Sequence, residues 1–130
     1  MATARLPDAE LEIMKIIWAS GGETTSAYIS EKLEGKRDWA VTTVLNFLAR
    51  LADRGFLEVR RSGKTNIYTP LVGEDEYLEN ESKSFLERLH GNSLKSLVAS
   101  LYSGKAVSRS DLEELRRYID EKAGETRADN

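Results

Sequence analysis

Four polar side chains at helical spacing are the clearest candidates for recognition chemistry in this chain. They lie in the segment AVTTVLNFLAR, residues 40–50, where Val44, Phe47, Leu48 and the following Leu51 recur at the spacing of one helix face. On the opposite face, hydroxyl, amide and guanidinium groups can exchange hydrogen bonds with an external partner. These groups belong to Thr42, Thr43, Asn46 and Arg50. The arrangement indicates binding to a polar surface.

Basic residues follow this segment, although the chain as a whole is acidic. Residues 36–68 hold seven Lys or Arg and three Asp or Glu, a net charge of +4, whereas the whole chain carries −3. Arg60, Arg61 and Lys64 are suited to pairing with phosphate groups. The stretch SGKT resembles the end of a nucleotide-binding P-loop, but Glu58 stands where that motif needs its first Gly. A strand is also expected after it in place of the required helix, so we exclude a P-loop.

The residue types needed for catalysis and metal binding are scarce. The 130 residues include no Cys and a single His, His90. Disulfides, thiolate metal sites and Cys nucleophiles are therefore excluded, and His90 has no second His with which to form a metal site. Neighbouring carboxylates such as Glu113 and Glu114 point in different directions on a helix, so they form no acid–base pair. We expect neither an enzyme nor a cofactor.

Three predicted helices and a hairpin position the polar face. Helices are expected over residues 9–19, capped by Asp8, from about Thr25 or Ser26 to Gly35, and from about Val41 to Arg54. FLEVRR and TNIYTPL then alternate as strands around a tip with Gly at its centre. This order predicts a winged helix-turn-helix, in which the third helix enters the DNA major groove and the hairpin touches the backbone.

That architecture gives each polar candidate a role. Thr, Asn and Arg side chains can contact base edges or phosphates, so Thr42, Thr43, Asn46 and Arg50 are predicted to face DNA. The wing would add phosphate contacts from Arg60, Arg61 and Lys64. A merely solvated helix face is the alternative for any amphipathic helix. The order of elements, the local charge and two Thr at the helix start, where Thr is a poor helix former, favour DNA binding.

The composition changes after residue 72. Residues 1–72 carry a net charge of +1 and residues 73–130 carry −4. Three more helices are expected over 73–90, ending at His90, and over 92–102 and 108–124, the last with a capping-box spacing of Ser110 and Glu113. Leu112, Leu115 and Ile119 form a narrow apolar stripe that suits contact with a partner chain. We therefore predict a mainly α protein with a winged-helix DNA-binding domain at 1–72 and a helical dimerisation domain at 73–130.

The start of the chain lacks the layout of a signal peptide, because Asp8, Glu10 and Glu12 interrupt its apolar run. No stretch approaches the roughly 20 apolar residues of a membrane span. We expect a cytoplasmic protein with no membrane insertion.

Several stretches together resemble the penicillinase-repressor family of winged-helix regulators (the BlaI, MecI and CopY type). They are LPDAELEIMKIIW, WAVTTVLNFLARLADRGFLE, YTPLV and ESKSFLERLHGNSLKSLV, which lie along nearly the whole chain. The resemblance implies a homodimeric transcriptional repressor that binds an inverted-repeat operator in double-stranded DNA. It places Thr42, Thr43, Asn46 and Arg50 on the DNA face and Lys64 in the wing. The expected dimer interface comprises Phe85, Leu89, Leu97, Leu101, Leu112, Leu115 and Ile119.

The resemblance also bears on how the repressor would release DNA. Copper-responsive members carry a C-terminal cysteine metal site, which this chain lacks. Members that respond to β-lactams are cleaved within a C-terminal helix, in a pathway with a membrane-anchored sensor protease, and the matching bond here is Ser100–Leu101. The regulated operon would then be of the β-lactam-resistance type or a related one. Two alternatives stay open: a winged-helix protein-interaction module, and a repressor induced by a small ligand.

Overall fold

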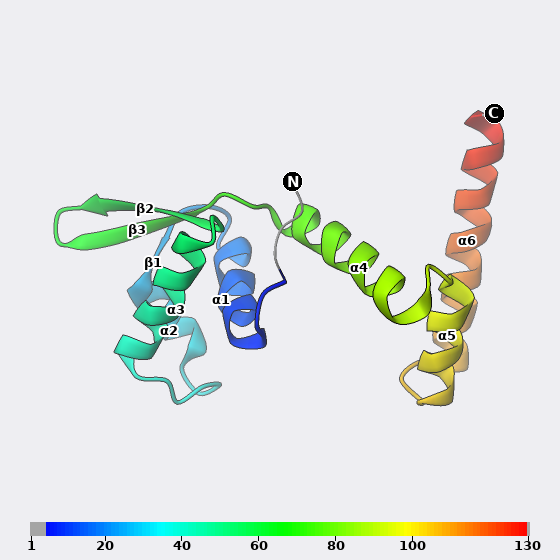
Figure 1. The fold of residues 1–130 in the computed structure, drawn as a ribbon, viewed down its shortest axis with the longest axis horizontal. Helices are drawn as coiled ribbons and strands as arrows, with labels where there is room; N and C mark the ends of the chain where they lie inside the picture. The colour runs from blue at the N-terminus through cyan, green and yellow to red at the C-terminus, as the bar shows by residue number, and fades with distance from the viewer. Residues whose placement is uncertain (1–4, 130) are drawn as a thin grey trace. The chain divides into compact units, whose positions relative to one another are not determined.

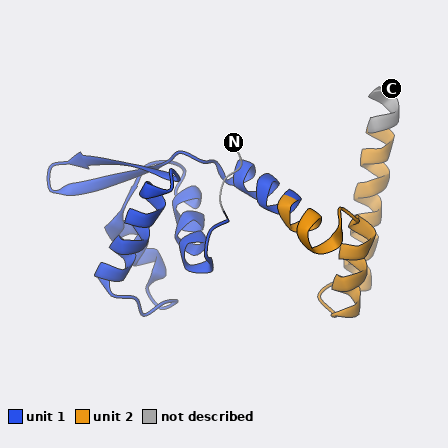
Figure 2. Ribbon diagram, in the orientation of Figure 1, with its two compact units in different colours: residues 1–83 blue, residues 84–130 orange. Residues whose placement is uncertain are grey.

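The computed structural model describes residues 5–129, with side chains described as far as Glu125. The chain divides into two compact units, residues 1–83 and 84–130 (Figure 2). The first unit contains α1 (Asp8–Ala19), β1 (Thr24–Thr25), α2 (Ser26–Leu33), α3 (Val41–Asp53), β2 (Leu57–Ser62), β3 (Thr65–Pro70) and the first part of α4 (Glu74–His90) (Figure 1). The second contains the rest of α4, α5 (Leu94–Ser103) and α6 (Arg109–Asp129).

The first unit is held together by apolar residues at helical spacing. Ile13, Met14 and Ile17 of α1 are fully buried, and they form one core with residues of α2, α3 and the sheet. The partners from the other helices are Ile29, Leu33, Val44, Leu48 and Leu51. The antiparallel sheet has the order β1–β3–β2, and its β2–β3 hairpin extends beyond the helices (Figure 1). The three helices and the hairpin follow the predicted order.

The helix starts agree only in part with the predictions. Asp8 does not cap α1, because the N-cap is Pro7 and Asp8 is the first helical residue, where its negative charge favours the helix dipole. Thr25 does cap α2, since its hydroxyl accepts a hydrogen bond from the backbone N–H of Tyr28 at 3.2 Å. The same Thr25 belongs to β1, a two-residue strand that pairs with β3 and was not predicted. A strand this short has no alternation that a sequence could reveal.

The start of α4 packs on the first unit through Tyr77. This side chain is buried, its hydroxyl accepts a hydrogen bond from the backbone N–H of Leu6 at 2.9 Å, and its ring lies 5.8 Å from Trp18 and 5.9 Å from Phe56. The compact units therefore divide after Lys83, within α4, whereas the predicted domain boundary lies between residues 72 and 73. The division into a DNA-binding and a dimerisation domain at that point stays a prediction.

In the second unit each helix start has its own cap. The hydroxyl of Ser93 accepts a hydrogen bond from the N–H of Ser96 at the start of α5, and α4 ends at His90, as predicted. The predicted capping box of α6 is wrong by two residues. The N–H of Ser108 donates to Asp111 Oδ2 at 2.8 Å, and the N–H of Asp111 donates to the Ser108 hydroxyl at 3.1 Å. The Ser108 N–H, and then its hydroxyl, lower the pKa of the Asp111 carboxyl.

Candidate nucleic-acid interface

Helix α3 separates a buried row from an outward row of side chains. Thr42, Asn46 and Arg50, spaced four residues apart, are exposed, and Thr43 is half-buried at the edge of the same face. Phe47, expected on the buried face, is only half-buried. The guanidinium of Arg50 lies over the Phe47 ring, 5.9 Å from its centre, and a contact of this kind restricts how the Arg side chain can move.

The segment that precedes α3 is fixed by contacts that the sequence did not reveal. The Trp39 ring packs edge-on against Phe47 with centroids 5.2 Å apart, and the guanidinium of Arg37 lies 5.5 Å from the centre of the Trp39 ring. The Nε of Arg37 donates to both carboxylate oxygens of Glu12, at 2.8 and 3.2 Å. The N-terminal half of α3 is therefore supported by an aromatic pair tied to α1. Arg37 lies within the basic segment 36–68, and this was the sequence feature that could have pointed to its role.

The β2–β3 hairpin carries the three basic residues predicted in the wing. Gly63 has φ +64° at its tip, a conformation that side-chain-bearing residues rarely adopt. Arg60 forms an ion pair with Glu23, and both side chains are more than half exposed. Arg61 Nε donates to the Gly63 carbonyl at 3.2 Å. Lys64 is exposed and has no ion pair with the residues that the structure describes.

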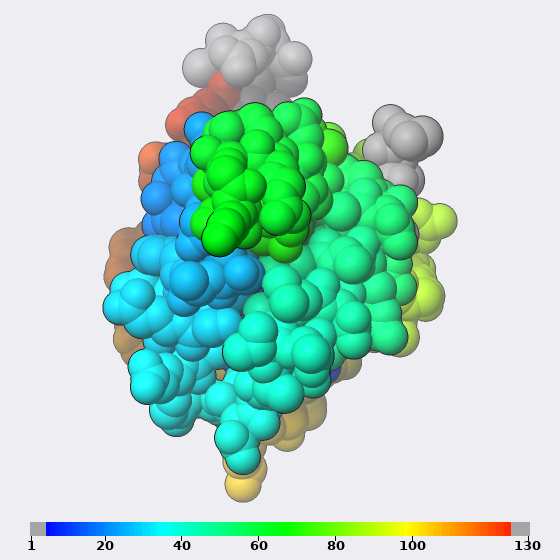
Figure 3. All heavy atoms as spheres, turned by 90° about the vertical axis from the view of Figure 1, so that its left-hand side faces the viewer, coloured from blue at the N-terminus to red at the C-terminus, as the bar shows by residue number. Residues whose placement is uncertain are grey.

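The hairpin and α3 share one face of the first unit. In the space-filling view, α3, the segment before it and the hairpin form one continuous surface (Figure 3). Arg50 is exposed on α3, and Arg61 and Lys64 are exposed on the hairpin. The combination offers exposed hydrogen-bonding groups on α3 and positive charge on the hairpin.

A buried ion pair fixes the other end of α3. Arg54, the C-cap residue of α3, donates from Nη1 to Oε1 of Glu10 at 2.6 Å. The Glu10 side chain is 2 % exposed and the Arg54 side chain is 40 % exposed. Glu10 stands in the stripe of buried α1 residues that continues with Ile13, Met14 and Ile17. A carboxylate in a buried stripe needs a partner. The position of Glu10 in that stripe could therefore have predicted an ion pair from the sequence.

The second unit leaves much of its apolar surface uncovered. A groove of about 510 Å³ lies between α5 and α6, and Leu112, Leu115 and Ile119 of the predicted interface line it. Its other lining residues are Leu94, Lys95, Val98, Ala99 and Tyr102. Phe85, Leu89 and Leu101 of the predicted interface are exposed outside this groove, and Leu97 is half-buried. The structure therefore brings three of the seven predicted interface residues together in one groove.

The predicted cleavage bond, Ser100–Leu101, lies inside α5 in regular helix. The carbonyl of Ser100 accepts a hydrogen bond from the N–H of Gly104 at 2.9 Å, and that of Leu101 accepts from the N–H of Ala106 at 2.9 Å. A protease that binds its substrate in extended form would first have to unwind the C-terminal turns of α5.

Residues 5–129 contain no group of three or more His, Cys, Asp or Glu placed to hold a metal ion. None of the helices described there is both long and apolar enough to cross a membrane.

Comparison with known proteins assigns the chain to a family. Residues 6–121 match the family model described as "Penicillinase repressor". The chain belongs to the penicillinase repressor family. A penicillinase repressor of Bacillus licheniformis is 33 % identical over 117 residues, which cover 90 % of this chain and 91 % of that protein. The methicillin resistance regulatory protein MecI of Mammaliicoccus sciuri is 29 % identical over 120 residues, which cover 92 % and 97 %.

A solved structure supports the fold of the first unit. The DNA-binding domain of the repressor BlaI matches 58 % of this chain with a TM-score of 0.51 and 31 % identity, and the match covers 90 % of that domain. The predictions of the penicillinase repressor family and of a winged helix-turn-helix followed by helices are both confirmed. The family is one of transcriptional repressors and not of enzymes, in agreement with the expectation from the residue types.

Proposed function

We infer that this member of the penicillinase repressor family is a homodimeric transcriptional repressor that binds an inverted-repeat operator in double-stranded DNA. The observation that carries the proposal is the exposed row of Thr42, Asn46 and Arg50 on α3, continuous with the cationic hairpin. In a winged helix the corresponding helix reads base edges in the major groove while the wing contacts phosphates. Acting on chromosomal DNA, the protein would work in the cytoplasm.

The roles of the side chains follow from their chemistry. Asn46 can form paired hydrogen bonds with adenine, Thr42 and Thr43 can contact a thymine methyl or a phosphate, and Arg50 can reach guanine or the backbone. Arg61 and Lys64 are suited to phosphates, because their charges have no carboxylate partner among the described residues. Arg60 could join them by exchanging Glu23 for a phosphate, since an exposed ion pair is weak.

The second unit would supply the dimer contact. Leu, Ile and Tyr side chains exposed on α4, α5 and α6 offer apolar surface that a partner chain could cover. A two-fold dimer would present two α3 helices to half-sites one helical turn of B-DNA, or a multiple of it, apart. Proteolysis at Ser100–Leu101 would separate α6 from the DNA-binding unit and weaken binding through lost bivalency.

Fluorescence anisotropy tests this proposal directly. The labelled duplexes are the region upstream of the gene that encodes this protein and a shuffled duplex of the same composition. We expect the upstream duplex to bind at least about 10³-fold more tightly at physiological salt, the lower end of the usual specificity ratio. Equal affinity for both duplexes would reject sequence-specific repression and favour the protein-interaction module.

A further inference from the structure

Helix α3 carries an exposed apolar row beside its polar row. The apolar row is Val41, Leu45 and Ala49, and the polar row is Thr42, Asn46 and Arg50, each repeating every four residues. Val41 is 64 % exposed, Leu45 is 39 % exposed, and Ala49 is exposed as well. Leu45 stands three residues after Thr42, and residues at this spacing are neighbours on a helix surface. The apolar row therefore lies alongside the groups proposed to read DNA.

The core of the first unit does not use this apolar row. The residues that α3 contributes to the core come from its other face, and they are Val44, Leu48 and Leu51. Val41 and Leu45 lie outside this core. A Val at an exposed helical position also lowers helix propensity, because its branched side chain loses rotamer freedom that an Ala would not lose. Neither packing in the first unit nor helix formation explains why Val41 and Leu45 are apolar, so we looked for an external partner of matching chemistry.

The chemistry of a DNA major groove narrows the choice of partner. Val and Leu side chains have no hydrogen-bond donor or acceptor, so they cannot pair with a phosphate or with the polar edge of a base. The apolar group that base edges present in the major groove is the 5-methyl group of thymine. The adenine paired with that thymine presents a donor and an acceptor, which suit the amide of Asn46. An apolar row beside an amide therefore matches A·T base pairs.

We propose that Leu45 and Val41 select thymine in the operator by packing against its 5-methyl group in the major groove. The inference rests on the proposed binding of operator DNA through α3, and it adds two specificity-determining residues to the polar row. Four residues rise about 6 Å along a helix and one base step rises about 3.4 Å, so the two thymines lie about two base steps apart. Burial of one methyl-sized group changes affinity about fourfold.

Replacement of thymine by uracil tests the proposal, because the two bases differ only by this methyl group. Fluorescence anisotropy with the full-length protein compares the upstream duplex with duplexes in which one thymine at a time is replaced by uracil. For the wild type we expect binding to weaken about fourfold at two positions of a half-site. In Leu45→Ala the replacement should have no effect at one of these positions, and in Val41→Ala it should have no effect at the other.

The matched control is Leu78→Ala, because Leu78 of α4 has the same side chain as Leu45 and a similar exposed fraction, 42 %. This variant should keep the full uracil effect at both positions. Ala is the strongest helix former, and the substituted side chains lie outside the core, so all three variants should remain folded. Thermal melting followed by circular dichroism verifies this for each variant.

Three outcomes would overturn the proposal. The first is wild-type protein that binds every uracil duplex as tightly as the thymine duplex, and the second is a full uracil effect at both positions in either α3 variant. The third is a lower oligomeric state of Leu45→Ala in sedimentation velocity, which would assign the apolar row to a contact between protein chains. Equal wild-type affinity for upstream and shuffled duplexes would reject the repressor function itself, whereas a preserved preference without a uracil effect would reject only this inference.

Discussion

Removing Arg54 should destabilise the first unit far more than removing an exposed arginine. The substitution Arg54→Met keeps an apolar stem but leaves the Glu10 carboxylate, 2 % exposed, without its partner at 2.6 Å. Breaking a buried ion pair by removing one member costs about 3–5 kcal/mol. Since the Arg54 side chain is 40 % exposed and water can reach that side of the pair, we expect the lower end, about 3 kcal/mol. For a domain of this size the melting temperature would fall by roughly 10–20 °C.

Urea denaturation of a double-mutant cycle measures this effect. The cycle comprises Arg54→Met, Glu10→Met and the double variant, in which no uncompensated charge remains. The double variant should be more stable than Arg54→Met alone, with a coupling of about 2 kcal/mol or more between the two sites.

The exposed pair of Arg60 and Glu23 provides the matched control. Both of its side chains are more than half exposed, so the corresponding cycle with Arg60→Met and Glu23→Met should give a coupling below about 1 kcal/mol. If Arg54→Met costs no more than Arg60→Met, or if the double variant is no more stable than Arg54→Met, burial of Glu10 does not govern the strength of this pair.

Four further measurements test the interface and the second unit. Lys64→Ala should weaken binding to all duplexes about equally and reduce the salt slope of anisotropy titrations by about one. An unchanged slope would show that Lys64 of the wing makes no phosphate contact. Asn46→Ala should instead change which base is preferred at one operator position, with a loss of about 1–3 kcal/mol of discrimination against the wrong base. Equal losses of affinity on operator and shuffled duplexes would contradict a role of Asn46 in base recognition. Leu115→Glu should give a monomer in sedimentation velocity, because a charge enters the apolar groove of the second unit, and a persisting dimer would place the contact elsewhere. In NMR titration, Ser108→Ala should raise the lowered pKa of Asp111 partway toward its usual value, because the hydrogen bond from the backbone N–H of residue 108 remains. An unchanged pKa would show that the Ser108 hydroxyl does not contribute to the shift.

The pH dependence of the α6 start follows from the direction of the Asp111 shift. A carboxyl whose pKa is lower in the folded state stabilises that state above its unfolded pKa, and the stabilisation is lost as the pH falls through the folded pKa. Because the pKa of Asp111 is lowered by its bonds to Ser108, acid should loosen the start of α6. This sensitivity should be smaller in Ser108→Ala.

Elements defined by local spacing were predictable from the sequence. The apolar periodicity of α1 and α3 and the Gly at the hairpin tip gave helices and strands close to those observed. The capping box of α6 was misplaced because both Ser108 and Ser110 have an acid three residues later. Val107 and Leu112, both half-buried, flank the Ser108 box at the spacing of a hydrophobic staple, and that pattern favours the observed start.

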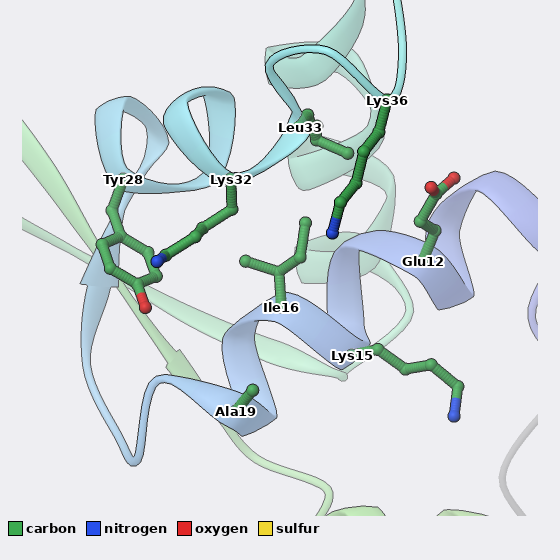
Figure 4. Close-up of a pocket in the computed structure, with 8 residues that line it drawn as sticks. All are labelled: Glu12, Lys15, Ile16, Ala19, Tyr28, Lys32, Leu33 and Lys36. Carbon is green, nitrogen blue, oxygen red and sulfur yellow. The ribbon is translucent and has the colours of Figure 1, made fainter.

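Features that depend on packing between distant segments could not be predicted. Glu10 and Arg54 are 44 residues apart, and nothing local to either one identifies the other. A groove lined by residues of α1, α2 and the turn after α2 likewise exists only because these segments pack together (Figure 4). In both cases sequence spacing gives the face of a helix, but the partner across the interface comes from the tertiary structure.

The same limit applies to the charge of the candidate DNA interface. Residues 36–68 carry +4, yet three of their seven basic side chains, Arg37, Arg54 and Arg60, pair with acids outside that range. Including those three acids lowers the local sum from +4 to +1, so Arg50, Arg61 and Lys64 remain as the principal cations of the exposed α3 and hairpin surface. About three phosphate contacts per winged helix are few beside the roughly 6–10 of a protein that holds DNA tightly. In the proposed dimer, the affinity of such a surface would therefore depend on joining two copies, and the contact between second units would be as important to repression as α3 itself.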